Sequence, residues 1–338
     1  MRFFLKFGLI LTILLIVASI LLPPSYDLTF PREPGPVTDR RVRTDHLKYL
    51  EERQPQIVVM GDSTLELGLD TEALAEQTGK SVYKIAIPGS ASALWYLILK
   101  NNIAESTYKP EYVLIVFRDS ILTAPGYRVH GSYFELVDEY ARRNEPLFIQ
   151  KSFVNLMNPL ERAAEKYFPL YVTRTQIRSR IDAGIRYLLP PIFGCDKNCV
   201  DYSLGDIFAG ADLEPQALVD AVGAAESYLY TPERLDFASQ VGDSYLPEMI
   251  RIAQENGIKL VFVRIKVETA DSASDSRLAE YLESLRTYLK EQDAYLLDFG
   301  DDPRFTRDLF RDVVHLNEEG KILFTQLVAE GLKEIFTD

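Results

Sequence analysis

Residues 57–63 of this 338-residue chain read IVVMGDS, and they determine the fold that the sequence predicts. Four consecutive apolar residues bounded by a glycine are typical of a short, fully buried strand. Gly61 and Asp62 then form a turn, and the next helix is expected near residues 71–77. A serine in this position projects at the carboxyl edge of a sheet, where a helix directs backbone N–H groups toward negative charge. The stretch therefore predicts Ser63 at a ligand-binding edge.

The same alternation of short apolar strands and helices continues along the chain. Further strands are expected at residues 82–87, 112–117, 258–265 and 294–299, and helices at residues 45–53, 95–104, 276–292 and 318–336. Buried strands separated by amphipathic helices predict a parallel sheet covered on both faces. The sequence thus indicates a three-layer, flavodoxin-like α/β fold.

Between about residues 145 and 230 the alternation stops. This segment contains a helical pattern and then a basic stretch of Arg174, Arg178, Arg180 and Arg186. We expect a mostly helical insertion. It could act as a lid, form a docking surface, or only add packing.

The N-terminus carries an apolar run over residues 7–22 that residues 3–5 extend to about the 20 residues a bilayer-spanning helix needs. Only Arg2 and Lys6 are charged before the run ends, so the positive-inside rule predicts a cytoplasmic tail and an exported remainder. A cleaved signal peptide is the alternative, with residues 17–19 as the small-residue site. The apolar residues that follow favour an uncleaved anchor. A buried soluble helix fits less well, because no polar face interrupts the run.

These patterns divide the chain into a transmembrane anchor at residues 1–22, a proline-rich stalk at residues 23–44 and a domain at residues 45–338 that contains the insertion. Cys195 and Cys199 lie in the exported part, where an oxidising compartment would favour a disulfide between them. Metal binding by the two thiols is a weaker alternative, since no third Cys or His stands nearby.

Charge and composition exclude several classes of function. The net charge is −13 with no basic block, so nothing would neutralise nucleic-acid phosphates. Without Arg2 and Lys6, 35 basic and 50 acidic residues remain, a net charge of −15. Two Cys and three His are too few for a zinc cage or an iron–sulfur cluster, and we expect no metal or cofactor.

A second motif stands just before the last predicted helix, at Asp312 and His315. A carboxylate three residues before a histidine can accept the Nδ1 proton, which leaves Nε2 to act as a base toward a serine. The less specific alternatives are that Ser63 caps a helix and that His315 packs beneath the last helix. The positions of both motifs predict that they meet at one edge of the sheet.

On these motifs the sequence resembles the SGNH or GDSL hydrolase superfamily, over roughly residues 56–117 and 258–336. The resemblance implies the SGNH hydrolase fold and a triad of Ser63, His315 and Asp312. It also implies that Gly89, after the second strand, helps the Ser63 N–H to form the oxyanion hole.

The resemblance is incomplete at the family's third block, Gly-x-Asn-Asp. Residues 116–119 read VFRD, so Arg118 replaces the asparagine that donates to the oxyanion. Arg118 could donate in its place, bind substrate or pair with Asp119, and Asp119 is itself a candidate for substrate binding. Arg264, at the end of the fourth strand, could bind an anionic group of the substrate or pair with a carboxylate.

Architecture extends the resemblance to membrane-anchored SGNH proteins that modify bacterial cell envelopes. It implies a single-pass protein of the cell membrane, with an extracytoplasmic serine enzyme that uses an acyl donor or ester substrate. That enzyme would be an esterase or an O-acyltransferase acting on an envelope polysaccharide, with a multipass membrane acyltransferase as a partner. The alternative is a catalytically weak binding or assembly factor that keeps the fold.

Overall fold

The computed structural model describes residues 2–174, 176–177, 180, 227–267 and 276–337. The chain forms two compact units. The smaller comprises Met1–Pro36 and Leu156–Val222, and the larger comprises Val37–Asn155 and Gly223–Asp338. All five strands and the candidate site lie in the larger unit.

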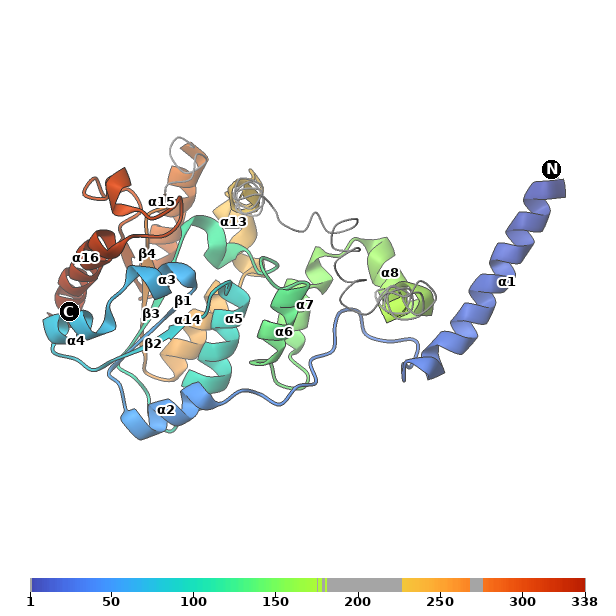
Figure 1. Ribbon diagram of the computed structural model, residues 1–338, viewed down its shortest axis with the longest axis horizontal. Coiled ribbons are helices and arrows are strands. Elements are labelled where there is room, and N and C mark those ends of the chain that lie inside the picture. The colour runs from blue at the N-terminus through green and yellow to red at the C-terminus, as the bar shows by residue number, and fades with distance from the viewer. Residues whose placement is uncertain (1, 175, 178–179, 181–226, 268–275, 338) are drawn as a thin grey trace, which may run out of the picture. The chain divides into compact units, whose positions relative to one another are not determined.

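A five-stranded parallel sheet forms the centre of the larger unit (Figure 1). Its strands are β1 (Ile57–Gly61), β2 (Val82–Ala86), β3 (Tyr112–Phe117), β4 (Lys259–Arg264) and β5 (Tyr295–Asp298). Their order is β2-β1-β3-β4-β5. This is the flavodoxin-like order, so the α/β fold predicted from the sequence is confirmed.

Helices cover both faces of the sheet, as the continuous apolar runs in β1 and β3 require. On one face lie α3 (Ser63–Gly68), α4 (Thr71–Thr78) and α16 (Glu318–Thr337). On the other lie α5 (Ser92–Ile98), α14 (Leu246–Glu255) and α15 (Ser276–Glu291). Every residue of β1 and β3 is buried between these layers. A ligand can therefore reach these strands only at their ends.

The remaining elements of the larger unit are short. They are α2 (Asp45–Arg53), the π-helical turn η1 (Leu99–Ile103), η2 (Asp119–Thr123), α6 (Ser132–Asp138), α7 (Pro146–Ser152), η3 (Val154–Leu156, which ends at the unit boundary), η4 (Tyr228–Tyr230), α13 (Phe237–Gln240), η5 (Val241–Asp243) and η6 (Arg307–Leu309).

The predicted strands agree with the observed ones to within one residue at either end. The structure differs directly after β1, where the sequence predicts a turn and a helix from residue 71. Instead, α3 begins at Ser63 itself. The six-residue helix is too short for a periodic pattern, and its start is fixed by the Asp62 side chain. The predicted helix to residue 104 ends as η1, a π-helical turn.

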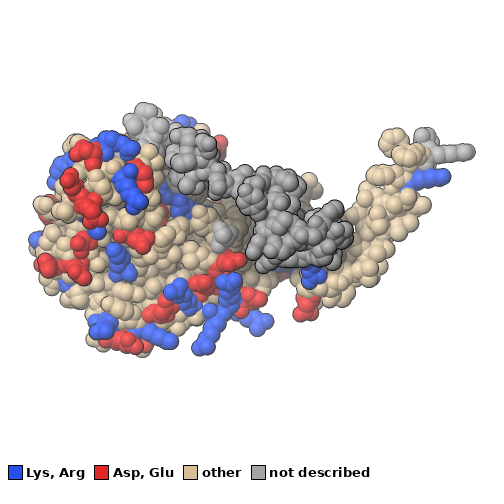
Figure 2. Space-filling view, viewed as in Figure 1, with Lys and Arg blue, Asp and Glu red and all other residues tan. Residues whose placement is uncertain are grey.

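The smaller unit contains α1 (Arg2–Ser25) and α8 (Pro159–Tyr167). Residues 3–25 of α1 form a helix long and apolar enough to cross a membrane, and none of that stretch is buried against the rest of the chain. In Figure 2, α1 shows almost no charged atoms, whereas basic and acidic side chains are mixed over the larger unit. Helix α1 continues through Pro23 and Pro24, beyond the predicted start of the stalk.

Candidate active site

Two segments of the chain form the site, and the first is the turn from β1 into α3. Asp62 is the N-cap of α3, and its Oδ1 accepts hydrogen bonds from the Thr64 N–H at 2.8 Å and the Thr64 hydroxyl at 2.7 Å. The Asp62 carbonyl accepts the Leu65 N–H at 3.1 Å. Asp62, rather than the serine, therefore caps the helix, and the Ser63 hydroxyl is not used as a cap.

The second segment is the turn before α16. Asp312 Oδ1 accepts the backbone N–H groups of Val314 at 2.8 Å and His315 at 2.9 Å. The Asp312 carboxylate also lies 2.9 Å from His315 Nδ1. Burial would raise the pKa of the Asp312 carboxyl, but the hydrogen bonds from Val314 and His315 hold it below its ordinary value. The carboxylate is therefore ionised and faces Nδ1, which places the imidazole proton there.

The two segments are in contact through Ser63 and His315. Ser63 Oγ lies 2.9 Å from His315 Nε2, although 252 positions separate the two residues in the chain. Ser63, His315 and Asp312 thus form one continuous line of hydrogen bonds. The line is open to solvent at its far end, where 47% of the Asp312 side chain is exposed.

Gly89 lies in the loop after β2 with φ of +78°, a conformation that favours glycine. A Cβ at this position would meet Tyr133 Cε1 at 2.9 Å, so the aromatic ring covers the glycine closely. Within the part of the chain that the structure describes, neither the Gly89 nor the Ser63 N–H donates to another residue. Both are available to an acceptor outside the protein.

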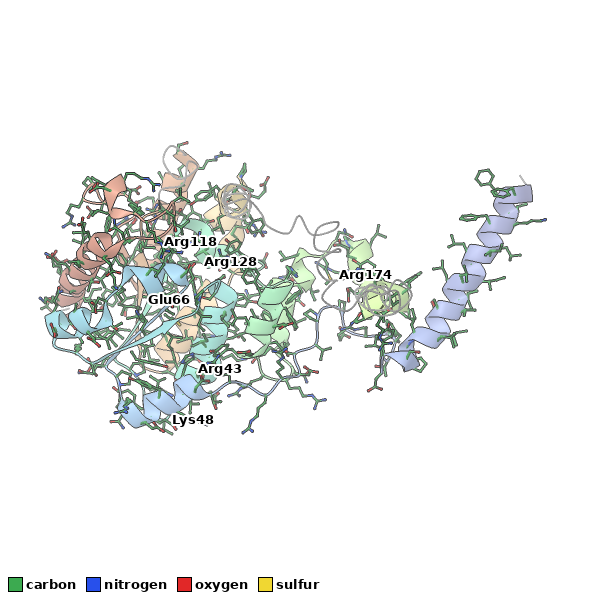
Figure 3. All side chains as sticks on the ribbon, viewed as in Figure 1. Arg43, Lys48, Glu66, Arg118, Arg128 and Arg174 are labelled. Carbon is green, nitrogen blue, oxygen red and sulfur yellow. The ribbon has the colours of Figure 1, made fainter. Side chains whose placement is uncertain are left out.

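Two arginines converge on the second oxygen of Asp62. Arg118 Nη2 lies 3.5 Å from Asp62 Oδ2, and Arg128 Nη1 lies 3.8 Å from the same atom. Figure 3 shows the two side chains next to each other beside α3. Burial opposes the charge of Arg118, but Asp62 and the nearby Tyr127 and Tyr230 raise its pKa above the ordinary value. Arg118 is therefore a buried, permanently charged cation that pairs with Asp62, the residue before Ser63 in the chain.

The sequence did not single out Arg128. It follows β3 by eleven residues, has φ of +54°, and its guanidinium lies over the rings of Tyr127 and Tyr133. Tyr133 is also the ring that covers Gly89, so Arg128 connects Asp62 with the Gly89 loop. The only sequence signal that could have identified Arg128 is that it is a basic residue in the loop after β3.

Asp119 and Arg264, the other candidate substrate-binding residues, bind each other. Arg264 donates from Nε and Nη2 to Asp119 Oδ1, at 3.0 and 2.8 Å. Its Nη1 also lies 3.1 Å from Asp298 and 3.0 Å from Asp301. Burial opposes the charge of Arg264, but the carboxylates raise its pKa. This geometry joins the ends of β3, β4 and β5, and substrate binding by either residue stays a prediction.

A buried contact ties the Gly89 loop to β1. The Trp95 indole donates to Ser90 Oγ at 2.9 Å, and Ser90 Oγ donates to the Gly61 carbonyl at 3.1 Å. A Cβ on Gly61 would meet Leu65 Cβ at 2.9 Å and the Val116 carbonyl at 3.0 Å, so only glycine fits there. These contacts fix Ser63 and Gly89 relative to each other.

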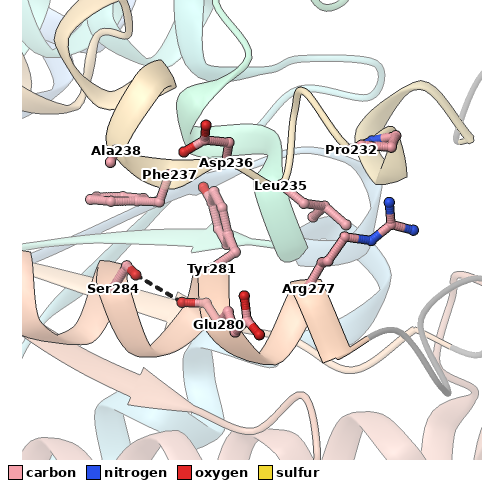
Figure 4. A pocket seen from close by; sticks show the side chains of 9 residues that line it. All are labelled: Pro232, Leu235, Asp236, Phe237, Ala238, Arg277, Glu280, Tyr281 and Ser284. Atoms are coloured by element: carbon pink, nitrogen blue, oxygen red, sulfur yellow. Dashed lines mark hydrogen bonds between the residues drawn. The ribbon is translucent and has the colours of Figure 1, made fainter.

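A separate pocket of about 240 Å³ lies between α13 and α15. It is lined by Pro232, Leu235, Asp236, Phe237, Ala238, Arg277, Glu280, Tyr281 and Ser284 (Figure 4). None of these residues belongs to the Ser63 site. The Tyr281 hydroxyl lies 2.8 Å from Thr123 Oγ1, which anchors α15 to the loop after β3.

The sequence analysis also considered a disulfide and a metal site. Cys195 and Cys199 lie outside the described residues. Within the described ranges, no group of three or more His, Cys, Asp or Glu side chains is arranged to hold a metal ion.

The solved structures that are similar to this chain include three from different bacteria. One, from Bacteroides fragilis, is described as an acylhydrolase; it has 11% identity and a TM-score of 0.40, and the match covers 84% of this chain and 89% of that one. A lipolytic protein of the G-D-S-L family from Desulfitobacterium hafniense has 11% identity and a TM-score of 0.39, and the match covers 81% of this chain and 97% of that one. A GDSL-like lipase from Parabacteroides merdae has 12% identity and a TM-score of 0.38, and the match covers 88% of this chain and 100% of that one. No family model and no curated protein matches.

Proposed function

We propose that this chain is a membrane-anchored, extracytoplasmic serine acyl-transfer enzyme of the SGNH type. The observation that supports the proposal most strongly is the line of hydrogen bonds from Ser63 through His315 to Asp312. A nucleophile, a base within 2.9 Å and a carboxylate that orients the base are the three groups that acyl transfer through a serine requires.

In the proposed mechanism, Ser63 Oγ attacks the carbonyl carbon of an ester as its proton passes to His315 Nε2. Asp312 stabilises the imidazolium through Nδ1. The oxyanion accepts hydrogen bonds from the Ser63 and Gly89 N–H groups. When the tetrahedral intermediate collapses, His315 returns the proton to the leaving alcohol and the acyl group stays on Ser63. Water or a sugar hydroxyl, deprotonated by His315, then takes the acyl group and regenerates the free serine.

Water as acceptor gives an esterase, and a glycan hydroxyl gives an O-acyltransferase. The side chains of Asp312 and His315 are 47% and 24% exposed, so a polymer acceptor can reach the site at the surface. Helix α1, if it spans the membrane, would keep the site beside the cell envelope. We therefore favour an envelope polysaccharide as acceptor and a multipass membrane acyltransferase as the source of the acyl group.

Arg118 supports a second candidate function. It replaces the asparagine of the family motif, and its side chain, only 2% exposed, is paired with Asp62. If the oxyanion lacks that donor, the protein could instead be an SGNH-fold binding or assembly factor for a membrane acyltransferase.

A fluorophosphonate probe and p-nitrophenyl acetate turnover distinguish the two functions in the full-length chain. The enzyme proposal expects labelling and turnover that Ser63→Ala abolishes. Ser284→Ala is the matched control, since this exposed serine only donates to the Glu280 carbonyl in its own helix. Labelling that Ser63→Ala does not change would support the binding factor.

The acceptor is tested separately with glycan oligomers. Acylated glycan supports the transferase, and free acid without acylated glycan supports the esterase.

A further inference from the structure

Helix α8 in the smaller unit carries an apolar stripe that none of the residues described by the structure covers. Leu160 is 82% exposed and Tyr167 is 60% exposed, and Ala163 between them is also exposed. Leu156 extends the row before the helix begins. Within α8, the spacings of three and four residues place Leu160, Ala163 and Tyr167 on one face of the helix.

The helix itself is well formed, so the stripe has a fixed geometry. Asn158 Oδ1 accepts the Glu161 N–H at 3.0 Å, and Glu161 Oε2 accepts the Asn158 N–H at 2.9 Å. These two bonds make a capping box. No residue of α8 is fully buried, so tertiary packing does not account for its apolar residues.

The polar face of α8 binds the chain that follows α1. The Arg32 N–H donates to the Lys166 carbonyl at 3.1 Å, and Arg32 Nη1 lies 3.8 Å from Glu165. The guanidinium of Arg180 lies 4.5 Å from the ring of Tyr26, directly after α1. Glu165 is on the side of the helix opposite the stripe, so these contacts leave the stripe uncovered.

These contacts limit how far α8 lies from the membrane. Arg32 follows the end of α1 at Ser25 by seven residues, which span at most about 25 Å when fully extended. The real path is shorter, because the chain turns back after α1 and the Leu28 N–H donates to the Pro23 carbonyl at 2.9 Å. The last turn of α8 is therefore held close to the point where α1 would leave a bilayer.

The charge of this segment differs from that of the whole protein. Residues 156–180 contain five basic and two acidic residues, a net charge of +3, whereas the whole chain carries −13. An exposed apolar stripe with a tyrosine, in a locally basic segment, is typical of helices that lie in the interface of an anionic bilayer.

We propose that residues 156–174 lie on the outer surface of the bilayer that α1 crosses, with Leu156, Leu160, Ala163 and Tyr167 in the headgroup region. The proposal depends on the membrane anchoring of α1 and not on the chemistry of Ser63. Lipid is the occupant that the structure favours, because the tether keeps a bilayer within reach of the stripe at all times.

Tryptophan fluorescence in the full-length chain, reconstituted in phosphatidylethanolamine–phosphatidylglycerol vesicles, tests this. The chain has one tryptophan, Trp95, which is 1% exposed inside the larger unit and serves as the background signal. Leu160→Trp and Tyr167→Trp place reporters on the stripe. Ile322→Trp, at a residue 66% exposed on α16, is the matched control, and Leu14→Trp reports on α1.

We expect lipids brominated near the headgroup to quench the reporters at 160 and 167 at least twofold more than the reporter at 322. Lipids brominated deep in the acyl chain should quench the reporter at 14. Quenching at 14 without quenching at 160 and 167 would overturn the surface placement alone. No quenching at 14 would overturn the anchoring and the placement together. A stripe reporter shielded from iodide but insensitive to brominated lipid would show that protein covers it and would also overturn the placement.

Discussion

Asp62 and Asp312 each hold a neighbouring functional residue in place. Asp62 caps α3 with one oxygen and faces two arginines with the other. Asp312 accepts two backbone N–H groups and orients His315. In both cases the carboxylate forms the local turn and also positions the side chain that reacts, so the turns and the chemistry depend on the same residues.

Asp312→Asn should lower kcat by about 10²- to 10⁴-fold, because an amide no longer fixes the proton on His315 Nδ1. KM should change little. The control is Asp308→Asn, at a nearby exposed aspartate. Steady-state ester hydrolysis gives both constants, and an Asp312→Asn enzyme with the wild-type kcat would contradict the assigned role of the carboxylate.

Arg118→Met should lower the free energy of unfolding by about 3–5 kcal/mol, because Asp62 would be left as a buried charge without its main partner. Arg128→Met should lower it by less than about 1 kcal/mol, since this guanidinium is farther from Asp62 and partly exposed. Urea denaturation measures both values. Adding Asp62→Asn should recover part of the Arg118→Met loss, and equal losses in the two single variants would refute this account of the pair.

At the scale of elements, the loop after β2 and the helix after β1 are fixed against each other. Gly89→Ala must move either the loop or Tyr133, whose ring lies 2.9 Å from the added Cβ. We expect kcat to fall by on the order of tenfold or more, since an oxyanion donor moves with the loop.

Gly79→Ala is the matched control. Gly79 also has a positive φ, of +69°, but nothing lies within 4 Å of an added Cβ. It should cost about 1 kcal/mol of stability and leave kcat unchanged. Tyr133→Ala in the Gly89→Ala background should restore part of the activity, and no recovery would show that backbone strain alone is responsible.

Helix α2 is attached to β2 through a histidine. His46 Nδ1 lies 2.8 Å from the Tyr83 hydroxyl and Nε2 lies 3.1 Å from the Tyr140 hydroxyl. Burial lowers the pKa of His46 in the folded protein. The unfolded chain therefore takes up this proton first, so the stabilisation from neutral His46 is complete above about pH 6.5 and is lost as the pH falls toward the lower folded value.

His46→Gln should remove this pH dependence from the melting temperature between pH 8 and pH 5. His130, whose pKa burial also lowers, contributes with the same sign, so the difference between variant and wild type carries the test. Parallel melting curves for the two proteins across that range would show that His46 is not the group responsible.

The sequence predicted the strands well because they are continuous apolar runs, which depend only on local composition. It also predicted that Ser63, after a strand, and His315, before a helix, meet at one edge of the sheet, and in the structure Ser63 Oγ lies 2.9 Å from His315 Nε2. It gave pairing with a carboxylate as one alternative for Arg264 but did not identify Asp119 as the partner, and it did not predict the pairing of Arg128 with Asp62. Such pairs join segments far apart in the chain, and their geometry depends on side-chain packing that no local pattern encodes.

For the molecule as a whole, both the extracytoplasmic location and the surface placement of α8 require that α1 spans a membrane. We expect the full-length chain to remain with the membrane fraction after alkaline carbonate extraction. A chain that lacks residues 3–22 should be released. A reporter that is active only outside the cytoplasm should be active when it is fused to the C-terminus, and activity of a cytoplasmic reporter there would invert the proposed topology.

The central claim is that Ser63 carries the acyl group. Rapid quenching of the full-length protein with p-nitrophenyl acetate, followed by peptide mass spectrometry, detects the intermediate directly. We predict one acetyl group on the peptide that contains Ser63, formed in the wild type and Ser284→Ala, reduced in His315→Asn and absent in Ser63→Ala. An unmodified Ser63 peptide during active turnover, or acetylation that is equal in His315→Asn and the wild type, would contradict the claim.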